Sequence, residues 1–179
     1  MKTTQILIAG FGGQGILFSG KFLAYKGLKE ELQVSWLPSY GPEMRGGTAN
    51  CNVILSETPV GSPIITTPDV LIAMNLPSLQ KYVNSVAKGG QIYVDTSLID
   101  AKVERDDVEV FYIPATQIAK DEGISTLANM IIIGHLLENH PELSFEGVET
   151  VVESLVPPKK AALKELNMKA LTLGKNYAK

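Results

Sequence analysis

The chain has 179 residues, of which 45% are hydrophobic and 20% are charged, and its net charge is −3. These values are ordinary for a globular protein and suffice for one domain with a full core, which we expect to span residues 1–179. A negative net charge gives no basic footprint for nucleic acid or for an anionic membrane. No apolar run is long enough to span a bilayer, and the first residues lack the features of a signal peptide, so we expect a cytoplasmic protein.

The first recognisable unit is an apolar strand, a tight turn and a helical pattern near the N-terminus. The turn fits G-x-G-x-x-G with one additional glycine. The residues that define it are Gly10, Gly12, Gly13, Gln14 and Gly15. Glycines let a backbone turn sharply and let a ligand approach it closely. The free N–H groups and the dipole of the following helix then favour an anion at this position.

The second strand indicates whether such a turn belongs to a dinucleotide-binding site. A dinucleotide site also needs a carboxylate at the end of this strand, to bind the ribose hydroxyls. The strand is predicted at 33–37 and leads into Pro38 without an acid, while Glu30 and Glu31 precede it. The sequence therefore disfavours NAD(P) and FAD. Two interpretations stay open: the glycines only permit close packing of helix on strand, or they form an anion site of another kind, which we favour.

The loop at 38–47 is the second informative stretch. It places Tyr40, Glu43, Arg45 and Gly46 among two prolines and several glycines. An arginine beside glycines can bind a phosphate or a carboxylate through two hydrogen bonds. Glu43 would either line a ligand site or orient Arg45. An ordinary surface loop, an interface loop and a ligand loop all remain compatible with this composition.

The next strand, predicted at 48–55, contains the one cysteine of the chain, Cys51. Two strands joined by about ten residues favour an antiparallel pair. A single cysteine cannot form an internal disulfide or by itself hold an iron–sulfur cluster. We expect Cys51 to be buried rather than a catalytic thiol, because no base lies near it in the sequence. His135 and His140 have no partners at ligand spacing, so we predict no metal site, and we predict no catalytic residue.

The second half of the chain alternates short strands with helices. After an extended piece near 60–65, the predicted strands are 69–74, 91–95 and 108–113. The predicted helices are 76–88, a short one capped by Thr116, 125–139, one that begins near Ser144, and 159–173 with Gly174 as its stop. The apolar face of the last helix is predicted to consist of Ala162, Leu163, Leu166, Ala170 and Leu173.

The helix at 125–139 has an apolar centre, Met130 to Ile133. Such a helix is buried on most sides, either wholly within the core or in part against a partner. Strands that alternate with helices favour an α/β class: a single three-layer α/β/α domain with a mixed, mostly parallel sheet and a Rossmann-like first βα unit. The glycine turn and the 38–47 loop both follow strands, so we expect both at one edge of the sheet, where ligands of such folds bind.

The pair GFGGQG and PSYGPEMRGGTANC resembles the gamma subunit of the 2-oxoacid:ferredoxin oxidoreductases, over essentially the whole chain. This family acts on pyruvate, 2-oxoglutarate and branched-chain 2-oxoacids, and a similar domain occurs in indolepyruvate ferredoxin oxidoreductase. The resemblance implies an enzyme that decarboxylates a 2-oxoacid, transfers the acyl group to coenzyme A and reduces ferredoxin. The stretch after Arg45 is more similar to the 2-oxoglutarate and branched-chain types, and 2-oxoglutarate is our first choice of substrate.

The resemblance also implies a division of labour. Alpha, beta and delta-type subunits would carry thiamine diphosphate, magnesium and iron–sulfur clusters, and this chain alone would be inactive. Coenzyme A is the cofactor that it would contact, with the N–H groups of the glycine turn on the pyrophosphate. Arg45 would add charge, and Tyr40 and Glu43 would shape the mouth. The alternative is a purely structural subunit whose turn and loop only bury against partners.

Overall fold

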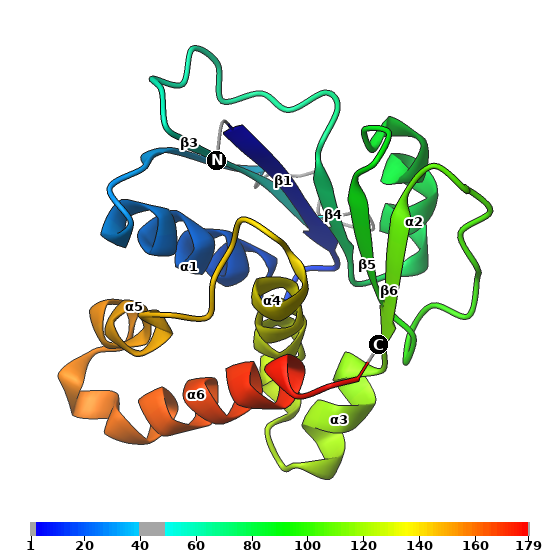
Figure 1. The fold of residues 1–179 in the computed structure, drawn as a ribbon. Coiled ribbons are helices and arrows are strands. Elements are labelled where there is room, and N and C mark those ends of the chain that lie inside the picture. Colours follow the sequence, from blue (N-terminus) through cyan, green and yellow to red (C-terminus); the bar gives the residue numbers. More distant parts are fainter. Residues whose placement is uncertain (1–2, 40–48, 179) are drawn as a thin grey trace.

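The computed structural model describes residues 3–39 and 49–178 (Figure 1). Its centre is one six-stranded sheet with the strand order β2-β3-β1-β4-β5-β6. The strands are β1 Thr3–Gly10, β2 Gln33–Ser39, β3 Ala49–Ser56, β4 Val70–Ala73, β5 Gln91–Asp95 and β6 Glu109–Ile113. The apolar runs that predict these strands in the sequence are therefore all strands in the structure.

The sheet is mixed, as predicted. Strands β1, β4, β5 and β6 pair in parallel, whereas β3 runs antiparallel to both of its neighbours, β1 and β2. The expected antiparallel pairing across the 38–47 loop is thus confirmed. In the register of β1 and β3, Gly10 lies opposite Ala49, and in that of β2 and β3, Ser39 lies opposite Asn50. The end of β1 and the described ends of β2 and β3 therefore meet at one edge of the sheet.

Helices cover both faces of the sheet unequally (Figure 1). The helices are α1 Ile16–Lys29, α2 Leu76–Tyr82 with η2 Val83–Ser85, α3 Ala115–Asp121, η3 Ser125–Leu127, α4 Ala128–Asn139, α5 Val148–Leu155, η4 Pro158–Lys160 and α6 Ala161–Lys175. The larger core cluster joins one face of the sheet to α1, α3, α4, α5 and α6. The smaller cluster joins the other face to α2 and η2. This is the predicted three-layer α/β/α arrangement.

Several predicted boundaries are wrong, and each error has a local cause. Thr116 does not cap α3, whose N-cap is Pro114; its hydroxyl instead donates to the carboxylate of Asp95, 2.5 Å away. Ser144 does not cap α5, which begins after Gly147 in the left-handed conformation with φ 72°. In both helices the N-cap is another residue: Pro114 precedes Thr116 in the chain, and Gly147 follows Ser144.

Helix α4 is buried along nearly its whole length, from Ala128 to Leu137, as its apolar centre predicts. It packs against α6 at a very short distance, because two glycines face backbone carbonyls across the contact. A Cβ atom on Gly134 would clash with the carbonyl of Leu171, and one on Gly174 would clash with the carbonyl of Ile131. Gly174 lies within α6, which ends at Lys175, so the predicted stop is wrong.

The same contact corrects the predicted apolar face of α6. Its buried residues are Asn167, Ala170, Leu171 and Gly174. Leu163 and Leu166 are 40% and 37% exposed. Close approach of two backbones requires small residues, so the inward face of α6 is not its most apolar one.

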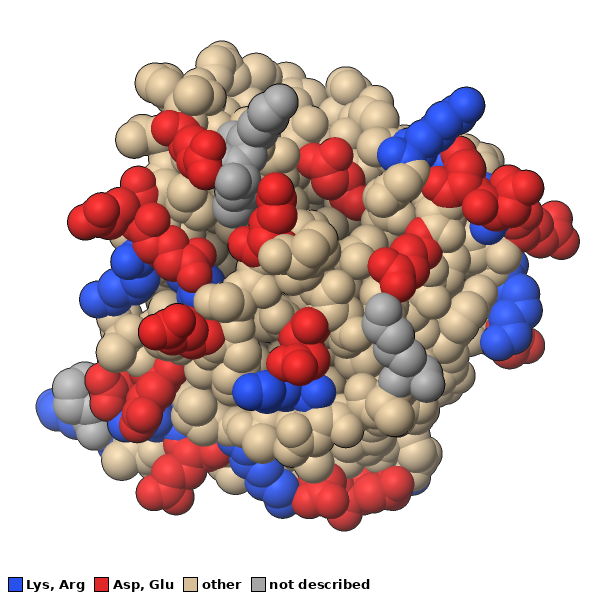
Figure 2. All heavy atoms as spheres, viewed as in Figure 1, with Lys and Arg blue, Asp and Glu red and all other residues tan. Residues whose placement is uncertain are grey.

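Charged side chains are interspersed with uncharged surface on the face that α5 and α6 form (Figure 2). The described residues form no broad basic patch on that face, in keeping with the negative net charge. Within 3–39 and 49–178, no helix combines the length and the apolar character needed to cross a bilayer. The cellular location stays a prediction.

Replacing Gly174 by alanine should lower the free energy of unfolding by about 3 kcal/mol or more, because the new methyl group meets a backbone carbonyl that cannot move aside. Urea unfolding followed by circular dichroism measures this change. Gly61→Ala is the matched control, since no atom lies within 4 Å of a Cβ there, and it should change the stability by about 0.5 kcal/mol or less. Equal stability of the two variants would show that α4 and α6 are less closely packed than described.

Candidate functional site

The glycine turn joins the end of β1 to the start of α1. Gly13 and Gly15 both have positive φ angles, 90° and 74°, which residues with a Cβ atom adopt only with strain. Gly15 is the N-cap of α1, and no side chain caps this helix. Within the described residues, the N–H groups of Gly12, Gly13 and Gly15 have no hydrogen-bond acceptor. The turn therefore presents several free donors at a helix N-terminus.

The side chain of Gln14 holds the turn in place. Its Oε1 accepts a hydrogen bond from the N–H of Phe11 at 2.6 Å, and its Nε2 donates to the carbonyl of Met74 at 2.9 Å. Gln14 thus joins the turn to the residue that follows β4. A Cβ on Gly10 would lie 2.6 Å from Gln14 Oε1, so Gly10 leaves the room that this side chain occupies. The sequence predicts only a backbone role for Gln14 and gives no sign of this one.

Gly15 is explained by helix packing. A Cβ on Gly15 would lie 2.5 Å from the Nδ2 of Asn129, at the start of α4. That amide nitrogen donates to the carbonyl of Gly15 at 3.2 Å and to the hydroxyl of Ser19 at 3.0 Å. The packing interpretation of the glycines therefore accounts for Gly10 and Gly15. It does not account for Gly13, because no atom lies within 4 Å of a Cβ there.

Gly13 borders a hollow of about 290 Å³ at the mouth of α1. The hollow is lined by Phe11, Gly12, Gly13, Gly15, Ile16, Leu17, Phe18 and Ala49. None of the residues in the first turn of α1 is acidic. Free N–H groups, a helix dipole and the absence of a carboxylate in that turn together favour an anion here.

The predicted site residues fall into two groups. Gly10, Gly12, Gly13, Gln14 and Gly15 lie together in the turn. Tyr40, Glu43, Arg45 and Gly46 lie outside the described residues. The residues that flank their loop, Ser39 and Ala49, are at the same sheet edge as Gly10, and Ala49 lines the hollow. The common edge that the sequence predicts for the two stretches thus holds for the described ends of the loop.

The described residues at this edge offer no free carboxylate for a ribose. β2 ends at Ser39 without an acid, so the ribose partner of a dinucleotide site is missing there, as the sequence indicates. Asp95, at the end of β5, is fully buried and accepts hydrogen bonds from the hydroxyl of Thr116 and the N–H of Ser97. It fixes the start of α3 and the segment after β5. Among the described residues, no group of three or more His, Cys, Asp or Glu could hold a metal ion.

Cys51 is buried in β3, as predicted. It is 0% exposed, and burial raises the pKa of its thiol to about 12. Its Sγ lies 3.4 Å from the carbonyl oxygen of Ile16, to which the thiol donates. A buried thiol with a raised pKa is a poor nucleophile, so the structure gives Cys51 a packing role.

These features define a class: an α/β domain with a mixed sheet whose first βα turn presents free amides but lacks the acid of a dinucleotide site. The model of one family, pyruvate ferredoxin/flavodoxin oxidoreductase, matches residues 5–177. The chain belongs to this family. The family that the sequence resemblance indicates is thereby confirmed.

Two curated relatives show the range within the family. The chain is 36% identical to ketoisovalerate oxidoreductase subunit VorA of Methanothermobacter marburgensis, over 99% of this chain and 37% of VorA. It is 34% identical to 2-oxoglutarate synthase subunit KorC of Methanothermobacter thermautotrophicus, over 96% of this chain and 93% of KorC. The chain thus spans about a third of the length of VorA and nearly the whole of KorC.

Two solved structures have the same fold. One is the gamma subunit of a keto/oxoacid ferredoxin oxidoreductase from Geobacter sulfurreducens, with a TM-score of 0.81 and 30% identity over 96% of this chain and 95% of that one. The other is 2-oxoglutarate:ferredoxin oxidoreductase from Magnetococcus marinus with 2-oxoglutarate, coenzyme A and succinyl-CoA bound. It gives a TM-score of 0.86 and 25% identity over 98% of this chain and 31% of that one.

The thiol of Cys51 should not react with a thiol reagent such as DTNB in the folded protein at pH 8, where a group with its pKa is about one part in ten thousand thiolate. It should react at once in urea, when burial is lost. The rate is followed by absorbance. A Cys51→Ala, Ser62→Cys double variant is the control, because residue 62 is exposed and should react in the folded state. Fast labelling of native Cys51 would contradict its burial.

Proposed function

We propose that this chain is the gamma subunit of a multi-subunit 2-oxoacid:ferredoxin oxidoreductase, inactive alone, whose glycine turn contributes to the coenzyme A site. The observation that carries the proposal is the set of N–H groups at Gly12, Gly13 and Gly15 that have no acceptor within 3–39 and 49–178. They border a hollow, and the first turn of α1 has no acid. Backbone donors at a helix start bind phosphates well. Coenzyme A carries a pyrophosphate and supplies the thiol that accepts the acyl group.

The residues of the turn fit this ligand better than they fit a dinucleotide. Gly13 has open space where a side chain would otherwise stand, so a phosphate can come close to the backbone. Gln14 keeps the turn fixed, which orders the donors before the ligand arrives. No acid at the end of β2 is available for an NAD ribose. We assign Tyr40, Glu43, Arg45 and Gly46, which lie outside the described residues, to the mouth of the proposed site.

Thiamine diphosphate, magnesium and iron–sulfur clusters belong to alpha, beta and delta-type partner subunits in this proposal, and ferredoxin accepts the electrons. A chain with one cysteine cannot supply the several thiolates of a cluster. Co-expression with the neighbouring subunits tests the assembly, since the purified complex should contain iron and thiamine diphosphate. Recovery of this chain alone under those conditions would contradict it.

2-Oxoglutarate is the proposed substrate. KorC matches nearly along its whole length, as expected for a separate subunit of the same kind. Ketoisovalerate is the second candidate, favoured by the higher identity of 36% to VorA. Pyruvate and indolepyruvate are the remaining family substrates. Comparing kcat/KM of the complex for these four 2-oxoacids decides between them.

A pair of substitutions at Gly13 tests the anion site. Asp and Asn have nearly the same shape and tolerate positive φ best among residues with a side chain, so the strain is matched. A carboxylate in the hollow should repel a phosphate, and Gly13→Asp should raise the KM for coenzyme A at least about tenfold over Gly13→Asn. Steady-state kinetics of the reconstituted complex, with the KM for the 2-oxoacid as internal control, measures this. Equal values would exclude an anion at the turn.

Arg45→Ala separates a ligand role from an assembly role. If the guanidinium binds coenzyme A, its loss should weaken coenzyme A binding roughly tenfold or more while the complex still assembles. If the subunit is purely structural, the same substitution should impair assembly and leave the kinetics of the assembled fraction intact. Gel filtration and coenzyme A titration of the same preparation distinguish the two results.

A further inference from the structure

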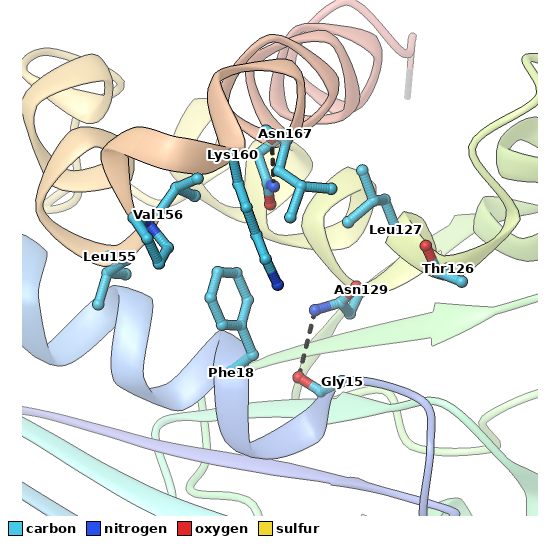
Figure 3. Close-up of a pocket in the computed structure, with 11 residues that line it drawn as sticks. Gly15, Phe18, Thr126, Leu127, Asn129, Leu155, Val156, Lys160 and Asn167 are labelled. Atoms are coloured by element: carbon cyan, nitrogen blue, oxygen red, sulfur yellow. Dashed lines mark hydrogen bonds between the residues drawn. The ribbon is translucent and has the colours of Figure 1, made fainter.

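The carbonyl group of Gly15 is the point at which α4 contacts the glycine turn. It accepts hydrogen bonds from the N–H of Ser19 at 2.9 Å, from the hydroxyl of Ser19 at 3.2 Å and from the side-chain amide of Asn129 at 3.2 Å. The first two donors belong to α1 itself. The third comes from the start of α4, 114 residues further along the chain, and Figure 3 shows the Asn129 side chain reaching toward Gly15.

Asn129 is a firmly held donor. It is 3% exposed, and its Nδ2 also donates to the hydroxyl of Ser19 at 3.0 Å. An amide nitrogen carries two hydrogens, so Gly15 and Ser19 together use both of them. The helix that carries Asn129 is itself buried along nearly its whole length. The amide is therefore fixed relative to the core and not to a surface loop.

Gly15 is a residue that needs such an anchor. Its φ and ψ angles, 74° and 17°, lie in the left-handed region, and no side chain caps the helix that begins after it. Glycine reaches more backbone conformations than any other residue, so its own structure does little to hold this one. The amide of Asn129 supplies a restraint on the N-cap residue from outside the helix. Only a glycine leaves room for it, because a Cβ at position 15 would lie 2.5 Å from Asn129 Nδ2.

Holding this carbonyl also fixes the directions of donors at the mouth of α1. The carbonyl of Gly15 and the N–H of Ile16 belong to one planar trans peptide group and point in opposite directions. Because the carbonyl points along α1 to Ser19, the N–H of Ile16 points out of the start of the helix. With φ and ψ of Gly15 held, the direction of its own N–H is set as well. Gly15 is partly exposed, and both residues line the hollow.

The turn is thus held from two sides. Gln14 attaches it to the residue after β4, and Asn129 attaches it to α4. From this geometry we infer that Asn129 is a positioning residue of the coenzyme A site, an inference that rests on the function proposed above. Its amide holds Gly15 so that the N–H groups at the mouth of α1 face the pyrophosphate before it binds. Asn129 acts through Gly15 and does not line the hollow itself.

Preorganisation is the physical reason for an effect on binding. Donors that already point at the ligand lose little freedom when it arrives, so the complex is tighter than with a mobile turn. If Asn129 only filled space between α1 and α4, a leucine of nearly the same shape would serve equally well. Asn129→Leu keeps the volume and removes the N–H donors, and it therefore separates positioning from packing.

Asn167→Leu is the matched control. Asn167 is 4% exposed, and its Nδ2 donates to a backbone carbonyl, that of Leu163, at 2.7 Å. It lies in α6, and within 3–39 and 49–178 it forms no hydrogen bond with the turn. Both substitutions thus remove one buried amide that donates to a carbonyl. They differ in whether that carbonyl belongs to the proposed site.

Calorimetric titration of the reconstituted complex with coenzyme A measures the effect on binding. Asn129→Leu should weaken coenzyme A binding about fivefold or more, whereas Asn167→Leu should leave it unchanged. In steady-state kinetics the KM for coenzyme A should rise by a similar factor, while kcat and the KM for the 2-oxoacid stay constant. Equal coenzyme A affinity of the two variants would overturn the inference.

The restraint itself can be measured in the full chain without a ligand. Nitrogen-15 relaxation should give lower order parameters for the N–H groups of Gly15 and Ile16 in Asn129→Leu than in Asn167→Leu. Unchanged order parameters would show that the amide does not hold the turn, and would overturn the inference independently of coenzyme A.

Ser19→Ala provides a second variant in case Asn129→Leu does not assemble. Alanine favours a helix, so this substitution should not impair folding, which circular dichroism checks. It removes both the hydroxyl that donates to Gly15 and the acceptor that holds the Asn129 amide. Coenzyme A binding should weaken in the same direction, by about twofold or more. Unchanged affinity in this variant would also contradict the positioning role.

The Gly13 pair keeps this inference distinct from the proposed function. A difference between Gly13→Asp and Gly13→Asn, together with normal coenzyme A binding in Asn129→Leu, would retain the anion site and refute the role of Asn129. Equal coenzyme A affinity of the two Gly13 variants would refute the anion site and the positioning role together.

Discussion

The enclosure of α4 is the constraint on which the rest of the structure depends. This helix is buried from Ala128 to Leu137, between the sheet and the outer helices. Neighbouring elements approach such a helix closely, and glycines make room at the contacts. Gly134 and Gly174 lie at the contact with α6, and Gly15 lies at the contact with the start of α1. Asn129, more than a hundred residues further along the chain, therefore helps to fix the start of α1 through its hydrogen bonds to Gly15 and Ser19.

The glycines of the turn differ in what a Cβ atom at each position would meet. Gly10 makes room for the Gln14 side chain, and Gly15 makes room for Asn129, so both are explained without a ligand. Gly13 is left with a positive φ and open space, and it is the position at which a phosphate can approach. Within these six residues, packing accounts for Gly10 and Gly15, whereas Gly13 is the position that we propose for the approach of a ligand. The packing interpretation therefore holds for Gly10 and Gly15, and the anion interpretation stays a prediction for Gly13.

The sequence predicts the sheet well because apolar runs such as Val70–Ala73 and Gln91–Asp95 are buried from both sides. It fails where long-range contacts override local signals. Gly174 is the residue type that often ends a helix, yet it lies within α6, where a Cβ would clash with a backbone carbonyl of α4. Leu166 fits an apolar stripe, yet Asn167 is buried in its place. The side chain of Gln14 donates a hydrogen bond to the carbonyl of Met74, and that of Asn129 donates to the carbonyl of Gly15. No sequence-spacing rule connects residues so far apart.

The electrostatics of the glycine turn follow from what surrounds it. The chain is acidic overall, and its charged side chains are mixed over the outer helices (Figure 2), so the molecule as a whole does not attract anions. The attraction must be local, from N–H groups and the helix dipole, which act within about the first turn of a helix. Because its electrostatic attraction is short-ranged, such a site binds an anion that other contacts have already brought close. A ligand with a phosphate at one end and its reactive group elsewhere, held jointly with neighbouring subunits, meets that condition better than free phosphate does.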